Sequence, residues 1–109
     1  METRLKMADH ILWIRVPGEL DHHSAEVICR EADRRIQRED IREVIFDFAD
    51  TTFCDSSGIG MLMGRYKMIR ALGGRVRAVR VQAQVARILT LSGVAKIIPV
   101  ELSEGGREK

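Results

Sequence analysis

The sequence has little of several features that mark specialised classes of protein. Its 109 residues include two cysteines, too few for a disulfide framework or a four-cysteine metal site. It has two prolines, with 45% hydrophobic and 31% charged residues, a composition that argues against disorder. No apolar run approaches the roughly 20 residues that span a bilayer, and the first residues lack the pattern of a signal peptide. We therefore expect a small cytoplasmic domain that does not act at a membrane.

The sequence also lacks a strong excess of either charge. Its 18 basic and 16 acidic residues leave a net charge of +2, too little for a surface built to hold a phosphate backbone. Metal binding is not expected either, because the adjacent His22 and His23 would point about 100° apart on a helix. Neither a dinucleotide fingerprint nor a phosphate-binding loop is present. We expect no nucleic-acid partner, no metal and no cofactor.

What is present is an alternation of strand and helix patterns. Alternating apolar residues predict strands at 3–7 and 11–16, joined as a hairpin at Asp9-His10. The elements predicted after them are helix 21–38 with Asp21 as N-cap, buried strand 44–48, loop 51–57, helix 57–72, strand 75–81 near a sheet edge, helix 85–91 and strand 96–100. This order predicts an α/β fold with a mainly parallel sheet of four to five strands, an N-terminal hairpin and helices packed on the sheet.

The loop after the most buried predicted strand is the first place to look for function, since clefts of such sheets lie beyond the carboxyl ends of strands. It leads into Cys54-Asp55-Ser56-Ser57-Gly58-Ile59-Gly60. One interpretation is structural: Asp55 or Ser56 caps the helix, and the glycines allow the turn and close packing. The other is that an exposed Ser56 accepts a phosphoryl group, partly stabilised by the helix N-terminus.

A catalytic serine is a weaker interpretation of the same segment. The glycine that precedes the serine by two positions in a nucleophile elbow is missing, and no histidine has an evident orienting partner. We therefore predict that the protein is not an enzyme. In the helix that follows, Met61 and Met68 either fill the edge of the core or form an exposed partner-binding ridge. A solvated face is the interpretation of five later arginines: Arg70, Arg75, Arg77, Arg80 and Arg87.

Several segments together resemble a known family. They are Gly18-Glu19-Leu20-Asp21-His22-His23-Ser24-Ala25-Glu26, Phe53 to Gly60, Gly64-Arg65-Tyr66-Lys67, Gly73-Gly74 and Leu91 to Ile98. In this order they resemble the sporulation-type (SpoIIAA-like) anti-sigma factor antagonists of the wider STAS domain family, over residues 3–100. We expect the domain at 1–102 and a polar tail at 103–109, which is too short and glycine-rich for the further helix with which the family usually ends.

The resemblance implies a phosphorylation switch. The unphosphorylated antagonist binds an anti-sigma factor that is also a serine kinase, and the sigma factor is released to activate transcription. The kinase phosphorylates the first serine of the motif, here Ser56, and a metal-dependent serine phosphatase restores it. The implied partner-binding residues are Asp21, His22, Asp55, Ser57, Gly58, Ile59, Gly60 and Met61. Two alternatives stay open: a STAS regulatory module of a lipid-transport or transporter system, and a small serine hydrolase.

Overall fold

The computed structural model describes residues 4–104, in which short strands and helices alternate. The elements are β1 (Arg4–Ala8), β2 (Ile11–Arg15), β3 (Glu19–Leu20), α1 (His22–Arg38), β4 (Glu43–Asp47), β5 (Phe53–Cys54), α2 (Ser56–Ala71), β6 (Arg75–Val81), α3 (Ala83–Leu91), the 3-10 helix η1 (Val94–Lys96) and β7 (Val100–Leu102). Most of the predicted polar tail, residues 105–109, lies outside the described residues.

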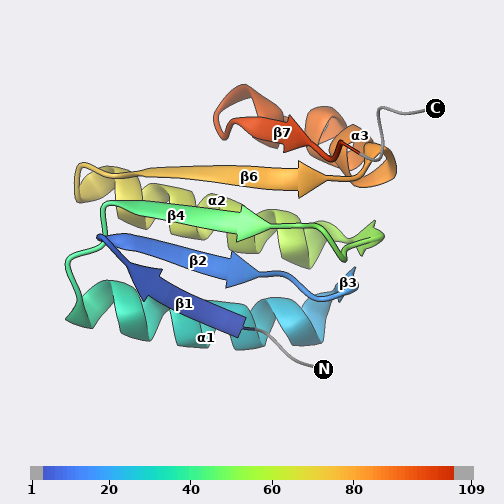
Figure 1. Ribbon diagram of the computed structural model, residues 1–109. Coiled ribbons are helices and arrows are strands. Elements are labelled where there is room, and N and C mark those ends of the chain that lie inside the picture. Colours follow the sequence, from blue (N-terminus) through green and yellow to red (C-terminus); the bar gives the residue numbers. More distant parts are fainter. Residues whose placement is uncertain (1–3, 105–109) are drawn as a thin grey trace.

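Five of the strands form one sheet in the order β1-β2-β4-β6-β7 (Figure 1). The first pair is antiparallel and the other three pairs are parallel. Asp9 and His10, which join β1 to β2, both have positive φ angles of 52° and 67°. Two left-handed residues match the right-handed twist of a tight hairpin. The predicted hairpin and the mainly parallel sheet are therefore confirmed.

Helices α1 and α2 cover one face of this sheet (Figure 1). The apolar stripe of α1 is buried against the sheet, as its spacing of three and four residues predicts. Its buried residues are Ala25, Ile28, Ala32 and Ile36. Opposite them, alternate residues of the central strands point to the same core, among them Leu12, Ile14, Val44 and Phe46. Burial of these side chains supplies the main driving force for the fold.

Strand β6 lies next to the edge strand β7, so its predicted place near a sheet edge is confirmed. Two other predicted elements differ from those observed. The last strand is Val100–Leu102, and the predicted strand at 96–100 overlaps η1 instead. The predicted loop 51–57 contains β5, which pairs with β3 in a separate two-stranded ladder. Strands of two residues are too short to show an alternating pattern, so the sequence could not reveal them.

The other face of the sheet carries charged side chains, and no helix covers it within residues 4–104 (Figure 1). Glu43 accepts a hydrogen bond from Arg77 Nε at 2.8 Å, and Arg77 also bonds Glu101 at 2.7 Å. Asp47, which is 0% exposed, pairs with Arg80 and accepts the indole N–H of Trp13 at 3.3 Å. These ion pairs of Glu43, Asp47, Arg77, Arg80 and Glu101 are called the charge ladder below. Strand β4 is therefore buried on both sides as predicted, by helices on one side and by the charge ladder on the other.

The five arginines predicted as a solvated face are exposed or half-exposed, and the charge ladder adds ion pairs to that prediction. Arg77 and Arg80 bond carboxylates of neighbouring strands. The register of β6 is interrupted between Ala78 and Val81, and Arg80 has a φ of 54° there. Strict alternation would send Arg80 to the helix face with Ala78; the irregularity lets it reach Asp47 instead.

Candidate functional site

The β3–β5 ladder brings two helix N-termini together. Leu20 pairs with Cys54 at the end of the ladder, and the backbone N–H of Asp55 donates to Leu20 O at 3.1 Å. The next residue on each strand is a helix cap: Asp21 caps α1, and Asp55 caps α2. The two cap residues therefore follow neighbouring paired strands beyond the carboxyl end of the main sheet, where the loop after β4 was expected to place a site.

Asp55, and not Ser56, caps α2. Its Oδ1 accepts from the backbone N–H of Ser57 at 2.8 Å and of Gly58 at 3.2 Å. Ser56 is the first residue of the helix, its side chain is exposed, and its hydroxyl makes no hydrogen bond within the described part of the chain. The two interpretations of this segment are thus compatible, since capping is done by Asp55 and the Ser56 hydroxyl is left accessible.

The capping by Asp55 reduces the number of hydrogen-bond donors that are available to a phosphate on Ser56. The N–H groups of Ser57 and Gly58, which could have bonded a phosphate, are already bonded to the Asp55 carboxylate. The helix dipole still favours an anion there, by roughly 0.3–1 kcal/mol at an exposed end. The adjacent carboxylate opposes it. The expected stabilisation of the phosphate by the helix N-terminus is therefore weaker than the sequence suggested.

Asp21, the N-cap of α1, is held by a reciprocal set of hydrogen bonds. Asp21 Oδ1 accepts from Ser24 N at 3.1 Å, and Ser24 Oγ accepts from Asp21 N at 2.9 Å, a reciprocal capping box. The hydrogen bond from the Ser24 N–H is the main reason that the pKa of Asp21 lies below its ordinary value, and it outweighs desolvation, which raises the pKa. His22 and His23 are exposed in the first turn of α1, as predicted.

A shallow hollow borders Ser56 on the side of α3. Its volume is about 370 Å³, and its lining residues are Cys54, Asp55, Ser56, Ile59, Ile88, Leu91 and Ser92. Leu91 is 79% exposed and nearby Phe53 of β5 is 47% exposed, high values for large apolar side chains. Ile88 and Leu91 were not among the residues predicted to bind a partner. A signal was available, because Leu91 lies off the inward line of α3 that Val85 and Leu89 define.

Two residues expected on the partner-binding surface are packing residues instead. Met61 is 2% exposed and belongs to the hydrophobic core, so its assignment to that surface is wrong. Gly58 is buried: a Cβ there would lie 2.7 Å from Leu20 Cγ and 2.8 Å from Cys54 Sγ. Its role is to let α2 approach β3. By contrast, Asp55, Ser57 and Ile59 are partly exposed and Gly60 is exposed, so all four can contact a partner.

The cysteine beside the site is buried and holds its proton. Cys54 is buried, and desolvation, assisted by the charge of Asp55, raises the pKa of its thiol to about 11. The thiol is therefore neutral at physiological pH. Within residues 4–104, no group of three or more histidine, cysteine or acidic side chains is placed to hold a metal ion.

None of the helices between residues 4 and 104 is both long and apolar enough to pass through a bilayer.

The sheet order, the helices packed on one face of the sheet and the serine at the start of α2 are together those of a STAS domain. The family model described as "STAS domain" matches residues 2–106, and the chain belongs to this family. The anti-sigma F factor antagonist of Paenibacillus polymyxa is 36% identical over 102 residues, which cover 92% of this chain and 87% of that protein. The resemblance seen in the sequence is thereby confirmed.

Solved structures show the same relationship. The anti-sigma factor antagonist SpoIIAA in its unphosphorylated form matches with a TM-score of 0.83 and 28% identity, covering 95% of this chain and 90% of that one. The Bacillus cell fate determinant SpoIIAA in its phosphorylated form matches with a TM-score of 0.75 and 28% identity, covering 95% and 94%. Both forms of that protein therefore share the fold described above.

Proposed function

We propose that this protein is an anti-sigma factor antagonist of the sporulation type and that phosphorylation of Ser56 controls its binding to an anti-sigma factor. The observation that carries the proposal is the Ser56 hydroxyl, which is exposed, makes no hydrogen bond within residues 4–104, and lies beside the capping carboxylate of Asp55 and an apolar hollow. The name of the Paenibacillus relative and the two forms of SpoIIAA support it. These relatives favour the function of an anti-sigma factor antagonist over that of a regulatory module of a transport system.

In the unphosphorylated state, the surface around Ser56 suits a protein partner. The hollow and Leu91 offer apolar area whose removal from water favours association by about 25 cal/mol per Å². Asp55 lines the hollow and Asp21 caps the neighbouring helix α1, and their negative charge selects a partner with complementary basic groups. Binding of the anti-sigma factor here releases the sigma factor, which then activates transcription.

Phosphorylation adds about −1.5 to −2 charges at Ser56. At an interface this charge must find cations or lose its hydration without compensation, and Asp55 and Asp21 repel it. A penalty of about 1.4 kcal/mol weakens binding tenfold, so a few kcal/mol are enough to release the partner. Because Asp55 keeps its bonds to α2, the switch acts through local charge and needs no large rearrangement.

The chemistry is carried out by partners. The anti-sigma factor acts as a serine kinase: the Ser56 oxygen attacks the γ-phosphorus of ATP, the bond to ADP breaks and ADP leaves, and a base of the kinase accepts the hydroxyl proton. A metal-dependent serine phosphatase hydrolyses the phosphoserine. Among residues 4–104 no histidine hydrogen-bonds Ser56: His22 and His23 lie exposed on α1, and His10 bonds Asp40 O at 2.8 Å at the start of β2. In this proposal the protein acts in the cytoplasm as a substrate and a switch, and not as an enzyme.

Intact-mass spectrometry after incubation with the anti-sigma factor kinase and ATP tests the proposal. We expect the mass gain of one phosphate in the wild type and in Ser57→Ala, and none in Ser56→Ala. A gain that survives in Ser56→Ala contradicts the assignment. An ester-hydrolysis assay on the same three proteins tests the hydrolase alternative, and activity lost only in Ser56→Ala would establish it.

A further inference from the structure

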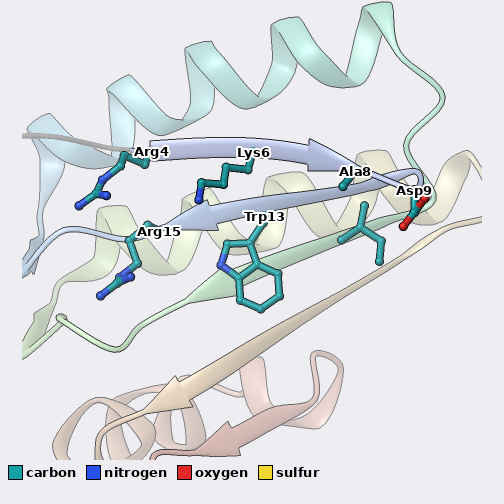
Figure 2. A pocket seen from close by; sticks show the side chains of 7 residues that line it. Arg4, Lys6, Ala8, Asp9, Trp13 and Arg15 are labelled. Atoms are coloured by element: carbon teal, nitrogen blue, oxygen red, sulfur yellow. The ribbon is translucent and has the colours of Figure 1, made fainter.

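The charged face of the sheet is covered by its own side chains on one half only. Across β4, β6 and β7 the ladder of ion pairs leaves Ile45 1% and Val79 6% exposed. Across β1 and β2 the face is hollow, with a volume of about 420 Å³ (Figure 2). This volume lies in the range of about 300–1,000 Å³ that is typical of small-molecule sites. Its lining residues are Arg4, Lys6, Ala8, Asp9, Ile11, Trp13 and Arg15.

The hollow is polar at one end and apolar along its floor. The register of the hairpin places Arg4 opposite Arg15, Lys6 opposite Trp13, and Ala8 opposite Ile11. These residues share one face because side chains alternate along a strand. Figure 2 shows Arg4 and Arg15 at the same end of the hairpin, with Trp13 between them and Asp9.

The positive charges at one end of the hollow destabilise the protein when nothing is bound there. Like charges directly opposite each other on paired strands are destabilising. Arg15 is compensated by Asp50, at 3.1 Å between Nη2 and Oδ2. Within residues 4–104, neither Arg4 nor Lys6 forms an ion pair. Paired strands lie about 4.8 Å apart and alternate residues about 6.8 Å apart, so these three long side chains can converge on one anionic group.

Trp13 gives the hollow a preset apolar surface. Its indole N–H is bonded to Asp47, which holds the ring in place, and the side chain is nevertheless 38% exposed. Partly exposed aromatic rings are common in binding sites, where they contribute apolar contact area at low entropic cost. Arg80 bonds both oxygens of Asp47, so the carboxylate that holds the indole is itself fixed by the charge ladder on the side of β4.

We propose that this hollow binds a small amphipathic anion: an aliphatic or aromatic body on Trp13, Ile11 and Ala8, and a single carboxylate or phosphate group at Arg4 and Lys6. The ligand neutralises charge that nothing else in the described chain compensates. The site is independent of the proposed switch, since Ser56 opens α2 and that helix covers the opposite face of the sheet.

Trp13 is the only tryptophan, so its fluorescence reports on the site directly. We expect saturable changes on titration with octanoate or octyl phosphate, and about tenfold weaker binding of octanol, which has the same chain but no charge. The two anions distinguish a carboxylate from a phosphate ligand. Equal response to octanol, or no saturable response to either anion, overturns the proposal.

A pair of double variants tests the cationic end. Arg4→Gln/Lys6→Gln should bind the preferred anion about tenfold or more weakly. Arg34→Gln/Arg38→Gln makes the same charge change on the exposed side of α1 and should bind like the wild type. Equal weakening in both variants would mean that only overall charge matters and would refute the site. Amide NMR shifts in the wild type give a second readout, and shifts confined to β1 and β2 are expected.

An acidic peptide serves as the competing ligand. If hexaglutamate binds this face and the octyl compounds do not, the surface docks a protein segment, and the proposal of a small-molecule site is wrong. Because Ser56 is not involved, Ser56→Asp should leave the titrations unchanged. Failure here therefore does not bear on the phosphorylation switch.

Discussion

Asp55 and Ser56 are adjacent in the chain but have different roles at the start of α2. Asp55 bonds the free N–H groups of the first turn, and such a cap contributes about 1 kcal/mol to stability. Ser56 bonds nothing in the described part of the chain and faces solvent. A modification of Ser56 can therefore change binding without removing the cap that holds the helix.

Replacing Ser56 by aspartate should mimic part of the switch. We expect Ser56→Asp to bind the anti-sigma factor at least about tenfold more weakly, since even one uncompensated interfacial charge exceeds 1.4 kcal/mol. The melting temperature should stay within about 2 °C, because the residue is exposed. Calorimetric titration and thermal unfolding measure the two effects. Ser56→Asp binding as tightly as Ser56→Ala would contradict the charge mechanism.

The exposed Leu91 allows a direct test of the apolar part of the surface. Leu91→Ala should weaken partner binding by roughly 1–2 kcal/mol while changing stability by less than about 0.5 kcal/mol. Leu72→Ala is the matched control, because Leu72 is also exposed, at 64%, but follows the other end of α2. Equal affinity of Leu91→Ala and Leu72→Ala would remove the α3 hollow from the interface.

At the scale of elements, α2 contains three glycines with different surroundings. Gly58 faces Leu20 and Cys54 so closely that a Cβ would overlap them, whereas a Cβ at Gly60 or Gly64 would meet nothing within 4 Å. Glycine inside a helix is unfavourable relative to alanine by about 0.5–1 kcal/mol. Only Gly58 therefore has a packing reason to be there: it sets the distance between α2 and the β3–β5 ladder.

Alanine substitutions at Gly58 and Gly64 should change the free energy of unfolding in opposite directions. Gly58→Ala should lower the free energy of unfolding by about 1–3 kcal/mol, because α2 must move away from the ladder. Gly64→Ala should raise it by about 0.5–1 kcal/mol. Urea denaturation measures both. A stabilising Gly58→Ala would show that the contact with Leu20 relaxes freely and that the ladder does not constrain the helix.

At the scale of the whole molecule, the charge ladder replaces a second layer of helices over the described residues. Burial raises the pKa of Asp47, but hydrogen bonds from Arg80, from the Ala49 N–H and from Trp13 outweigh it and hold the pKa below its ordinary value. Asp47 is thus charged in the folded protein at neutral pH and joins β2, β4 and β6 across the sheet.

This lowered pKa predicts a pH dependence of stability. The contribution of Asp47 is fully present above the unfolded value of about 3.9 and is lost as the pH falls through the lower folded value. Asp47→Asn should lower the free energy of unfolding at pH 7 by about 1–3 kcal/mol, a moderate loss because Arg80 is half exposed. Denaturation at pH 7 and at pH 2.5 should show a smaller difference between wild type and variant in acid. A difference that is constant with pH would contradict this role.

Local patterns were enough to predict much of the fold. The spacing of Ala25, Ile28, Ala32 and Ile36 identified α1 and its inner face, and Asp21 identified where it begins. The serine at the start of α2 was also identified from local features: an acidic residue, a pair of hydroxyls and flanking glycines at a strand-to-helix junction. Helix periodicity and capping depend on residues within a few positions of one another, so a single sequence contains them.

The tertiary structure decided which of these residues face each other. Met61 and Leu91 have similar apolar character, yet one is in the core and the other is among the most exposed residues beside Ser56. Arg77 and Arg80 form ion pairs with carboxylates on a neighbouring strand, and no spacing along the chain could indicate these pairs. The sequence by itself thus determined most of the elements and the place of Ser56 and its hydroxyl at the start of α2. The surroundings of that hydroxyl, and the hollow beside Trp13, came from strand order and helix packing, because contacts between distant segments depend on the whole fold.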